Sequence, residues 1–170
     1  NSEFNFFGPT PRLGNKLYLC CEELFNKKIE FLKIKWEYSN LPSGFKNLQE
    51  YYENYGNDIS DTSFKYELTA LSDFRYSGNE NSQSVFPLFE IDEQNKTSKF
   101  STLELSNLNF LTIKPNYKLR NGEIQRFSNK LETGILRFEL KSPSSGFGVD
   151  LYPIVSTKLL TEKVLKTKNN

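Results

Sequence analysis

The sequence predicts a mainly β domain: an antiparallel β-sandwich with one short central helix and a C-terminal helix. Aromatic residues make up 15% of the chain, and the 15 Phe and nine Tyr among them suit pleated, half-buried strands. Several short stretches alternate apolar and polar residues, which is the pattern of a strand with one buried face. Turn-forming residues separate these stretches, as they do in all-β domains.

The N-terminal third is expected to contain the best-defined strand. Residues 1–11 hold two prolines and are expected to form an irregular arm, and residues 12–19 a first strand. Residues 20–28 permit a helical turn as well as an extended chain. The clearest strand covers residues 32–38, where charged residues alternate with Leu32, Ile34, Trp36 and Tyr38. We therefore expect Trp36 to be buried on the apolar face of this strand.

A stripe of tyrosines predicts the short central helix. Leu48, Tyr51, Tyr52 and Tyr55 follow the helical spacing i, i+3, i+4 and i+7, and Gly56 is a plausible stop. Such a stripe more often anchors a helix to a sheet than it forms a platform for sugar rings. Both interpretations remain open at this point.

The centre of the chain alternates expected strands with polar loops. Pro87 cannot donate a ladder hydrogen bond, so its strand is expected at a sheet edge or a bulge. The expected order is a strand over 61–75, a loop over 77–83, a strand over 85–91, a loop over 92–99, one or two strands over 100–113 and turns over 114–130.

The C-terminal third is expected to run from a strand into a helix. Leu136, Phe138 and Leu140 alternate with charged residues, and Phe147 lies between two glycines as a ring that would pin the helix onto the sheet. The helix is expected from the spacing of Leu151, Val155, Leu159 and Val164. One β-rich domain is thus expected over residues 12–165, followed by a frayed end or linker over 166–170.

The residue content argues against an enzyme and against a cofactor or metal site. The chain has no His, which removes the commonest general base and metal ligand, and its only thiols are the adjacent Cys20 and Cys21. The glycines at 146 and 148 match no phosphate-binding pattern. The net charge of +1 gives no field that would attract nucleic acid or an anionic membrane.

Paired carboxylates are the remaining candidates for chemistry. Three pairs occur, and each lies in a polar stretch where solvated charge is the better interpretation: Glu22 with Glu23, Asp58 with Asp61, and Asp92 with Glu93. Residues 57–61 contain oxygen ligands but match no calcium-loop signature. The sequon at residues 95–97 is expected to arise by chance in an Asn-rich chain.

A set of short motifs in a fixed order resembles a known family. The motifs are Pro11-Arg12-Leu13-Gly14, Leu17-Tyr18-Leu19, Glu23-Leu24-Phe25, Lys27-Lys28, Trp36, Leu41-Pro42, Tyr51-Tyr52, Gly134 to Leu140, Phe147-Gly148 and Leu151-Tyr152-Pro153. Over residues 7–160 they resemble the J-like baseplate wedge proteins of contractile injection systems, especially the phage-tail-like particles of Bacteroidetes. Val149 departs from the family, which often has His at that position.

The resemblance implies a structural domain that belongs to a longer baseplate subunit and has no catalytic role. Its implied partners are other baseplate, sheath and spike-hub subunits, with no nucleic acid, no small-molecule substrate and no membrane insertion. Assembly is expected in the bacterial cytoplasm, with later release or membrane docking left open. The residues that carry the structural motif are Pro11, Arg12, Gly14, Trp36, Gly134, Phe147, Gly148, Leu151, Tyr152 and Pro153.

A carbohydrate-binding module is the alternative function. It would use Trp36 or the tyrosines as exposed stacking platforms, whereas a baseplate domain would bury Trp36 and contact other proteins. For a baseplate domain, the arm at residues 1–11 and the edge near Pro87 are the expected contact surfaces, because arms and edges offer unpaired backbone groups.

Overall fold

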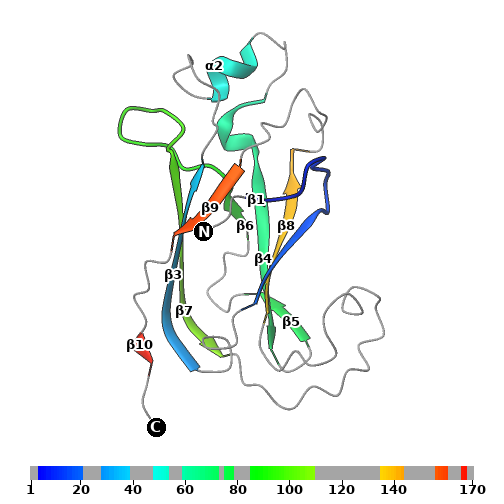
Figure 1. Cartoon of the computed structure of the whole chain (residues 1–170), viewed down its shortest axis with the longest axis vertical. Coiled ribbons are helices and arrows are strands. Elements are labelled where there is room, and N and C mark those ends of the chain that lie inside the picture. Colours follow the sequence, from blue (N-terminus) through cyan, green and yellow to red (C-terminus); the bar gives the residue numbers. More distant parts are fainter. Residues whose placement is uncertain are drawn as a thin grey trace.

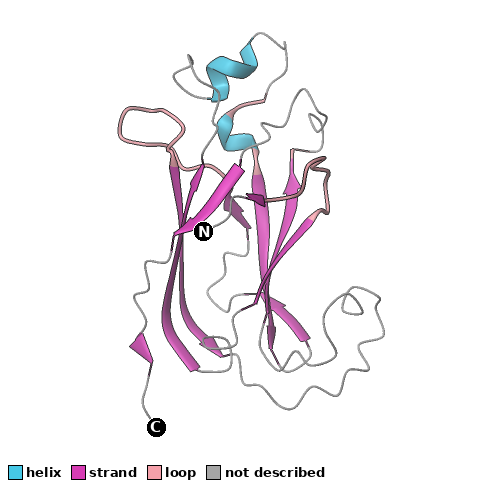
Figure 2. Cartoon of the chain, viewed as in Figure 1, coloured by secondary structure: helices cyan, strands magenta, loops and turns pink. Residues whose placement is uncertain are grey.

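The structure is a computed structural model of the 170-residue chain. It describes residues 4–20, 28–38, 48–53, 59–72, 75–78, 85–109, 135–143, 156–160 and 166–167. This part of the chain is mainly β, with two antiparallel sheets of five strands each and two short helices (Figures 1 and 2). The prediction of a mainly β, antiparallel domain with few helices is confirmed.

The strands divide between a first sheet and a second sheet. The first sheet contains β1 (Phe4–Asn5), β3 (Lys28–Tyr38), β7 (Phe100–Asn109), β9 (Ser156–Leu160) and β10 (Lys166–Thr167). The second sheet contains β2 (Lys16–Cys20), β4 (Lys65–Ser72), β5 (Arg75–Gly78), β6 (Val85–Pro87) and β8 (Ile135–Ser142). The helices are α2 (Leu48–Glu53) and a short 3-10 helix, η1 (Asp61–Ser63).

Strand β3 is the centre of the first sheet. One of its edges pairs with β7 along most of its length, and Ile34 lies opposite Leu103. The other edge is shared, because β9 pairs with the end of β3 and β10 with its beginning. Strand β1 continues the sheet beyond β9, where Phe4 lies opposite Thr157. The alternation predicted for residues 32–38 thus belongs to the most extensively paired strand of this sheet.

Strands β4 and β8 form the centre of the second sheet. Strand β2 pairs with β8, and the short strands β5 and β6 pair with opposite ends of β4. Pro87 lies opposite Lys65 in β6, whose only partner among the described strands is β4. The edge position predicted for Pro87 is therefore observed, although β6 is shorter than the predicted strand over residues 85–91.

One buried cluster joins side chains from both sheets and from α2. Trp36 and Leu103 come from the first sheet, Tyr66 and Phe138 from the second, and Tyr52 from the helix. The alternate residues of β3 and β8 that point away from this cluster are mostly half-buried or exposed. Burial of one face of each sheet is what the period-two pattern predicts, and aromatic rings supply much of the buried volume.

The N-terminal segment lies partly inside this core. After β1, the Gly8 N–H donates to the Asn5 carbonyl at 3.0 Å, and Gly8 has the positive φ of 85° that glycine accepts readily. The turn buries Phe6 and Phe7 at 5% and 3% exposure. The chain then enters β2, so this segment carries it from the first sheet to the second (Figure 1).

The predicted C-terminal helix is not confirmed. The described part of that stretch, Ser156–Leu160, is strand β9 and pairs with both β3 and β1. The spacing of Leu151, Val155 and Leu159 predicts a helix only from local pattern. Pairing with β3 and β1 determines the structure of residues 156–160 instead, because long-range pairing overrides local propensity. Beyond it, Lys166–Thr167 form β10 against β3, in the stretch expected to be a frayed end or linker.

Two further boundaries differ from expectation. The first strand begins at Lys16, because residues 12–15 form a turn in which the Asn15 N–H donates to the Arg12 carbonyl at 3.0 Å. The strand expected over residues 61–75 begins as η1 and becomes β4 only at Lys65.

Candidate functional site

Trp36 lies at the centre of the core, as its phase in β3 predicts. It is 1% exposed, and its ring centroid is 5.3 Å from that of Phe6. Tyr66 and Phe138 of the second sheet approach it edge-on, with centroids at 6.4 Å and 6.5 Å. Edge-to-face contacts of this kind add to the stabilisation from burial alone. A ring that is 1% exposed offers no surface to solvent on which a sugar could stack.

A buried polar network surrounds Tyr38. The Trp36 Nε1–H donates to the Tyr38 hydroxyl at 2.8 Å, and that hydroxyl donates to the Leu88 carbonyl. The Ser101 hydroxyl also donates to this carbonyl at 3.0 Å and lies 3.1 Å from the Tyr38 oxygen. Each polar group of this network thereby has a hydrogen-bond partner, as a low-dielectric interior requires.

The backbone of Leu88 connects the two sheets through this network. Its N–H donates to the carbonyl of Phe64, immediately before β4, at 2.8 Å. Its carbonyl accepts from Tyr38 of β3 and Ser101 of β7. The backbone of Leu88, the residue after β6, is therefore hydrogen-bonded to both sheets and fixes their position relative to each other.

Burial of Tyr38 and Tyr66 makes the stability of the protein sensitive to high pH. Desolvation raises the pKa of each phenol far above its ordinary value of about 10. Above about pH 10 the unfolded chain loses these protons while the folded chain keeps them. The free energy of unfolding is therefore expected to fall as pH rises, by about 1.4 kcal/mol per pH unit for each tyrosine.

Urea unfolding between pH 8 and pH 11.5 measures this effect, and the variant Tyr66→Phe provides the comparison. Its stability should decline less steeply above pH 10, because one of the two buried phenols is gone. Equal slopes for the two proteins would contradict the burial of the Tyr66 phenol.

The tyrosine helix anchors onto the core, in agreement with the structural interpretation of its stripe. Leu48 and Tyr52 are buried, and Tyr51 is half-buried against the same cluster. The Leu48 N–H at the start of α2 donates to the Thr97 hydroxyl at 3.0 Å, and that hydroxyl donates to the Asp61 carboxylate at 3.3 Å. Tyr55 lies outside the described residues.

Two described members of the carboxylate pairs, Asp61 and Asp92, hydrogen-bond to the backbone, whereas Glu93 is exposed. Asp61 is 4% exposed and accepts from the Thr62 N–H at 3.0 Å at the start of η1. Asp92 shapes its loop by accepting from the N–H groups of Gln94 and Lys96, both at 2.9 Å. Glu22, Glu23 and Asp58 lie outside the described residues. Within the described part of the chain, no three acidic, Cys or His residues gather as metal ligands would.

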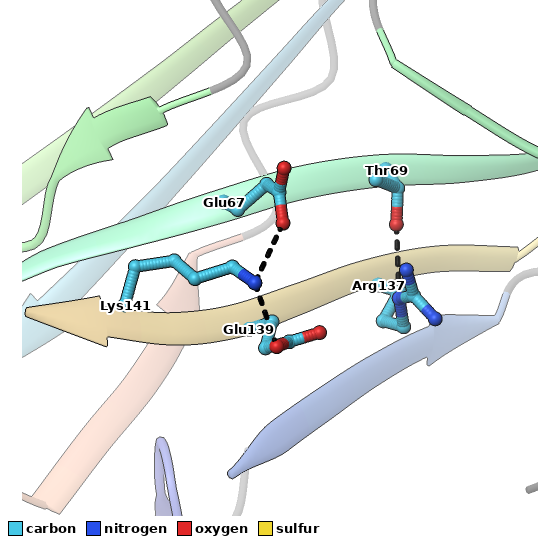
Figure 3. Close-up of polar contacts among 5 residues, drawn as sticks. All are labelled: Glu67, Thr69, Arg137, Glu139 and Lys141. Carbon is cyan, nitrogen blue, oxygen red and sulfur yellow. Dashed lines mark hydrogen bonds and ion pairs between the residues drawn. The ribbon is translucent and has the colours of Figure 1, made fainter. Parts of the chain in front are cut away.

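The outer face of the second sheet carries a row of charges (Figure 3). The Lys141 ammonium lies 2.8 Å from the Glu139 carboxylate and 3.0 Å from that of Glu67 on the neighbouring strand β4. The bond to Glu139, more than that to Glu67, raises the pKa of Lys141. Beside them the Arg137 Nε donates to the Thr69 hydroxyl at 3.0 Å. Lys141 is exposed and both glutamates are half-buried, and ion pairs this close to solvent add little stability.

The sequence motif at residues 11–14 forms the turn before β2. Pro11 is buried and Arg12 is exposed, while Gly14 has a φ of 80° and donates its N–H to the Leu140 carbonyl at 2.8 Å. This turn therefore attaches to the end of β8. The motif residues Gly134, Phe147, Gly148, Leu151, Tyr152 and Pro153 lie outside the described residues.

Sequence reasoning missed an apolar cavity of about 230 Å³ between the two sheets. No spacing rule could have found it, because its walls come from β1, β2, β3, β8 and the turn after β1. The lining residues are Phe4, Phe6, Leu17, Tyr18, Leu19, Ile34, Trp36 and Phe138.

No protein-family model, no curated protein and no solved structure matches the chain. Among the described residues, no helix has the length and hydropathy needed to cross a membrane.

Proposed function

We propose that the chain is a structural domain of a baseplate wedge subunit in a contractile, phage-tail-like injection particle. It acts through protein–protein contacts during assembly and triggering and carries out no reaction. Its partners in this role are other baseplate, sheath and spike-hub subunits, and it assembles with them in the bacterial cytoplasm.

The burial of Trp36 is the observation that most favours this proposal over a sugar-binding module. A stacking platform needs an exposed ring face, and Trp36 is 1% exposed. The large apolar side chains that are exposed in the described part of the chain are Leu13, Val85 and Ile91, none of which is aromatic. Asp61 and Asp92 of the predicted pairs accept hydrogen bonds from the backbone, as carboxylates in a scaffold would.

The architecture suits a scaffold as well. We interpret the two sheets, with one buried cluster drawn from both, as a β-sandwich. Cross-sheet hydrogen bonds through Leu88 and the aromatic contacts of the core give such a sandwich a rigid interior. A wedge domain needs this rigidity, because each copy in a ring must present the same surfaces to its neighbours.

The fluorescence of Trp36 separates the two functions, because this is the only Trp of the chain. A buried indole is expected to emit at short wavelength and to resist quenching by acrylamide. Affinity electrophoresis through immobilised polysaccharides should show no retardation. Red-shifted, easily quenched emission together with saturable retardation would instead support the carbohydrate-binding module.

Sedimentation from the native host tests the assembly itself. The protein that contains this chain, tagged at its own locus, should sediment in a sucrose gradient with particles far larger than one subunit. Sedimentation as a free monomer throughout growth would contradict the proposal.

A further inference from the structure

The cavity between the sheets has a buried floor and a half-buried rim. Phe6, Ile34, Trp36 and Phe138 are 1–7% exposed and form the floor. The other four lining residues are only half-buried and come from strands β1 and β2: Phe4, Leu17, Tyr18 and Leu19. An apolar space whose lining runs from a half-buried rim to a buried floor is accessible to a molecule from solution.

The chemistry of the lining specifies what can occupy it. Among the described lining residues none is charged, and the only polar groups of their side chains are the Tyr18 hydroxyl and the indole N–H of Trp36. The one polar atom of that indole is already satisfied, because its N–H donates to Tyr38. Water in such a space lacks the two to four polar partners it needs, and a charged ligand would lose its hydration without compensation.

The volume sets the size of the occupant. Apolar protein cavities of about 150 Å³ stay dry and accept a molecule as large as benzene. The volume here is about 230 Å³, which leaves room for one aromatic ring with a short substituent. We propose that this cavity is a binding site for a small, uncharged, apolar molecule of about that size.

Bromobenzene is a direct probe, because its heavy atom quenches a nearby indole and Trp36 lines the cavity as the only Trp. Titration into the purified protein should quench Trp36 along a saturable curve. Toluene should reverse the quenching by competition, and benzoate, a charged ring of similar size, should not. Quenching that rises linearly without saturation, or benzoate competing as well as toluene, would overturn the proposal.

Leu19→Phe supplies the matched variant, because a larger side chain on the rim fills part of the cavity. It should weaken the binding of bromobenzene at least tenfold, whereas Leu13→Phe, on an exposed turn outside the lining, should leave it unchanged. Leu17→Phe fills the same space from the same strand and replaces Leu19→Phe if that variant does not fold. Equal binding by wild type, the rim variant and Leu13→Phe would show that the probe binds elsewhere.

Discussion

Replacing Phe6 with Ala is expected to lower the free energy of unfolding by about 3–5 kcal/mol, the usual cost of deleting a buried Phe ring. Phe6 is 5% exposed, and its ring lies 5.3 Å from Trp36 of the first sheet and 5.4 Å from Phe138 of the second. Its removal therefore leaves a hole where the two sheets meet. Phe6 also lines the cavity, so on that side no neighbouring side chain is in position to fill the space that its ring leaves.

Urea denaturation monitored by circular dichroism measures this loss, and a fall in Tm of roughly 6–20 °C should accompany it. Leu13→Ala is the matched control, because Leu13 is 43% exposed and should change stability by about 0.5 kcal/mol or less. If Phe6→Ala were no more damaging than Leu13→Ala, the N-terminal segment would not lie in the core as described.

Tyr38→Phe is expected to cost about 1–3 kcal/mol, although it removes a single oxygen atom. The Trp36 N–H loses its acceptor at 2.8 Å, and it cannot reach water because the indole is 1% exposed. Of its two bonds from described side chains, the Leu88 carbonyl keeps the one from Ser101. The loss is therefore mainly the cost of leaving a buried donor unsatisfied.

Tyr66→Phe is the control for this substitution. Tyr66 is also 1% exposed, and desolvation, with a smaller effect of neighbouring charges, raises its pKa, while no hydrogen bond to its hydroxyl is found among the described residues. Removing its hydroxyl should therefore be neutral or stabilising at pH 7. Equal losses for Tyr38→Phe and Tyr66→Phe, measured by urea denaturation at pH 7, would contradict the assigned network.

Periodicity was sufficient to predict the elements that bury one regular face. In β3 the alternation of apolar and charged residues predicted both the strand and the burial of Trp36, because a period of two leaves one choice of inner face. The helix of the tyrosine stripe was predictable for the same reason, with the period of a helix. These patterns are local, so the sequence contains them in full.

Features that depend on distant pairing were not predictable in this way. The spacing near Leu159 fits a helix, yet the edge of β3 and the short strand β1 hold this stretch as β9. The prolines near the N-terminus suggested an irregular arm, while Phe6 and Phe7 enter the core because they are the central residues of the turn that Gly8 closes onto Asn5. Neither outcome follows from the residues of the segment alone.

The features of the candidate site were likewise only partly predictable from the sequence. The absence of His and the phase of Trp36 could be read from the sequence, and they favoured the proposal of a scaffold over that of an enzyme. The role of the Leu88 carbonyl could not be predicted, because a backbone group carries no residue-specific signal. The cavity was hidden because its walls come from five separate segments.

The composition of the native assembly is the most direct test of a baseplate role. The protein that contains this chain should be purified gently from its host, and the proteins in the same high-mass fraction identified by mass spectrometry. The proposal predicts sheath, tube and spike-hub proteins together with other baseplate subunits in that fraction. Recovery of the chain without any of these proteins would contradict it.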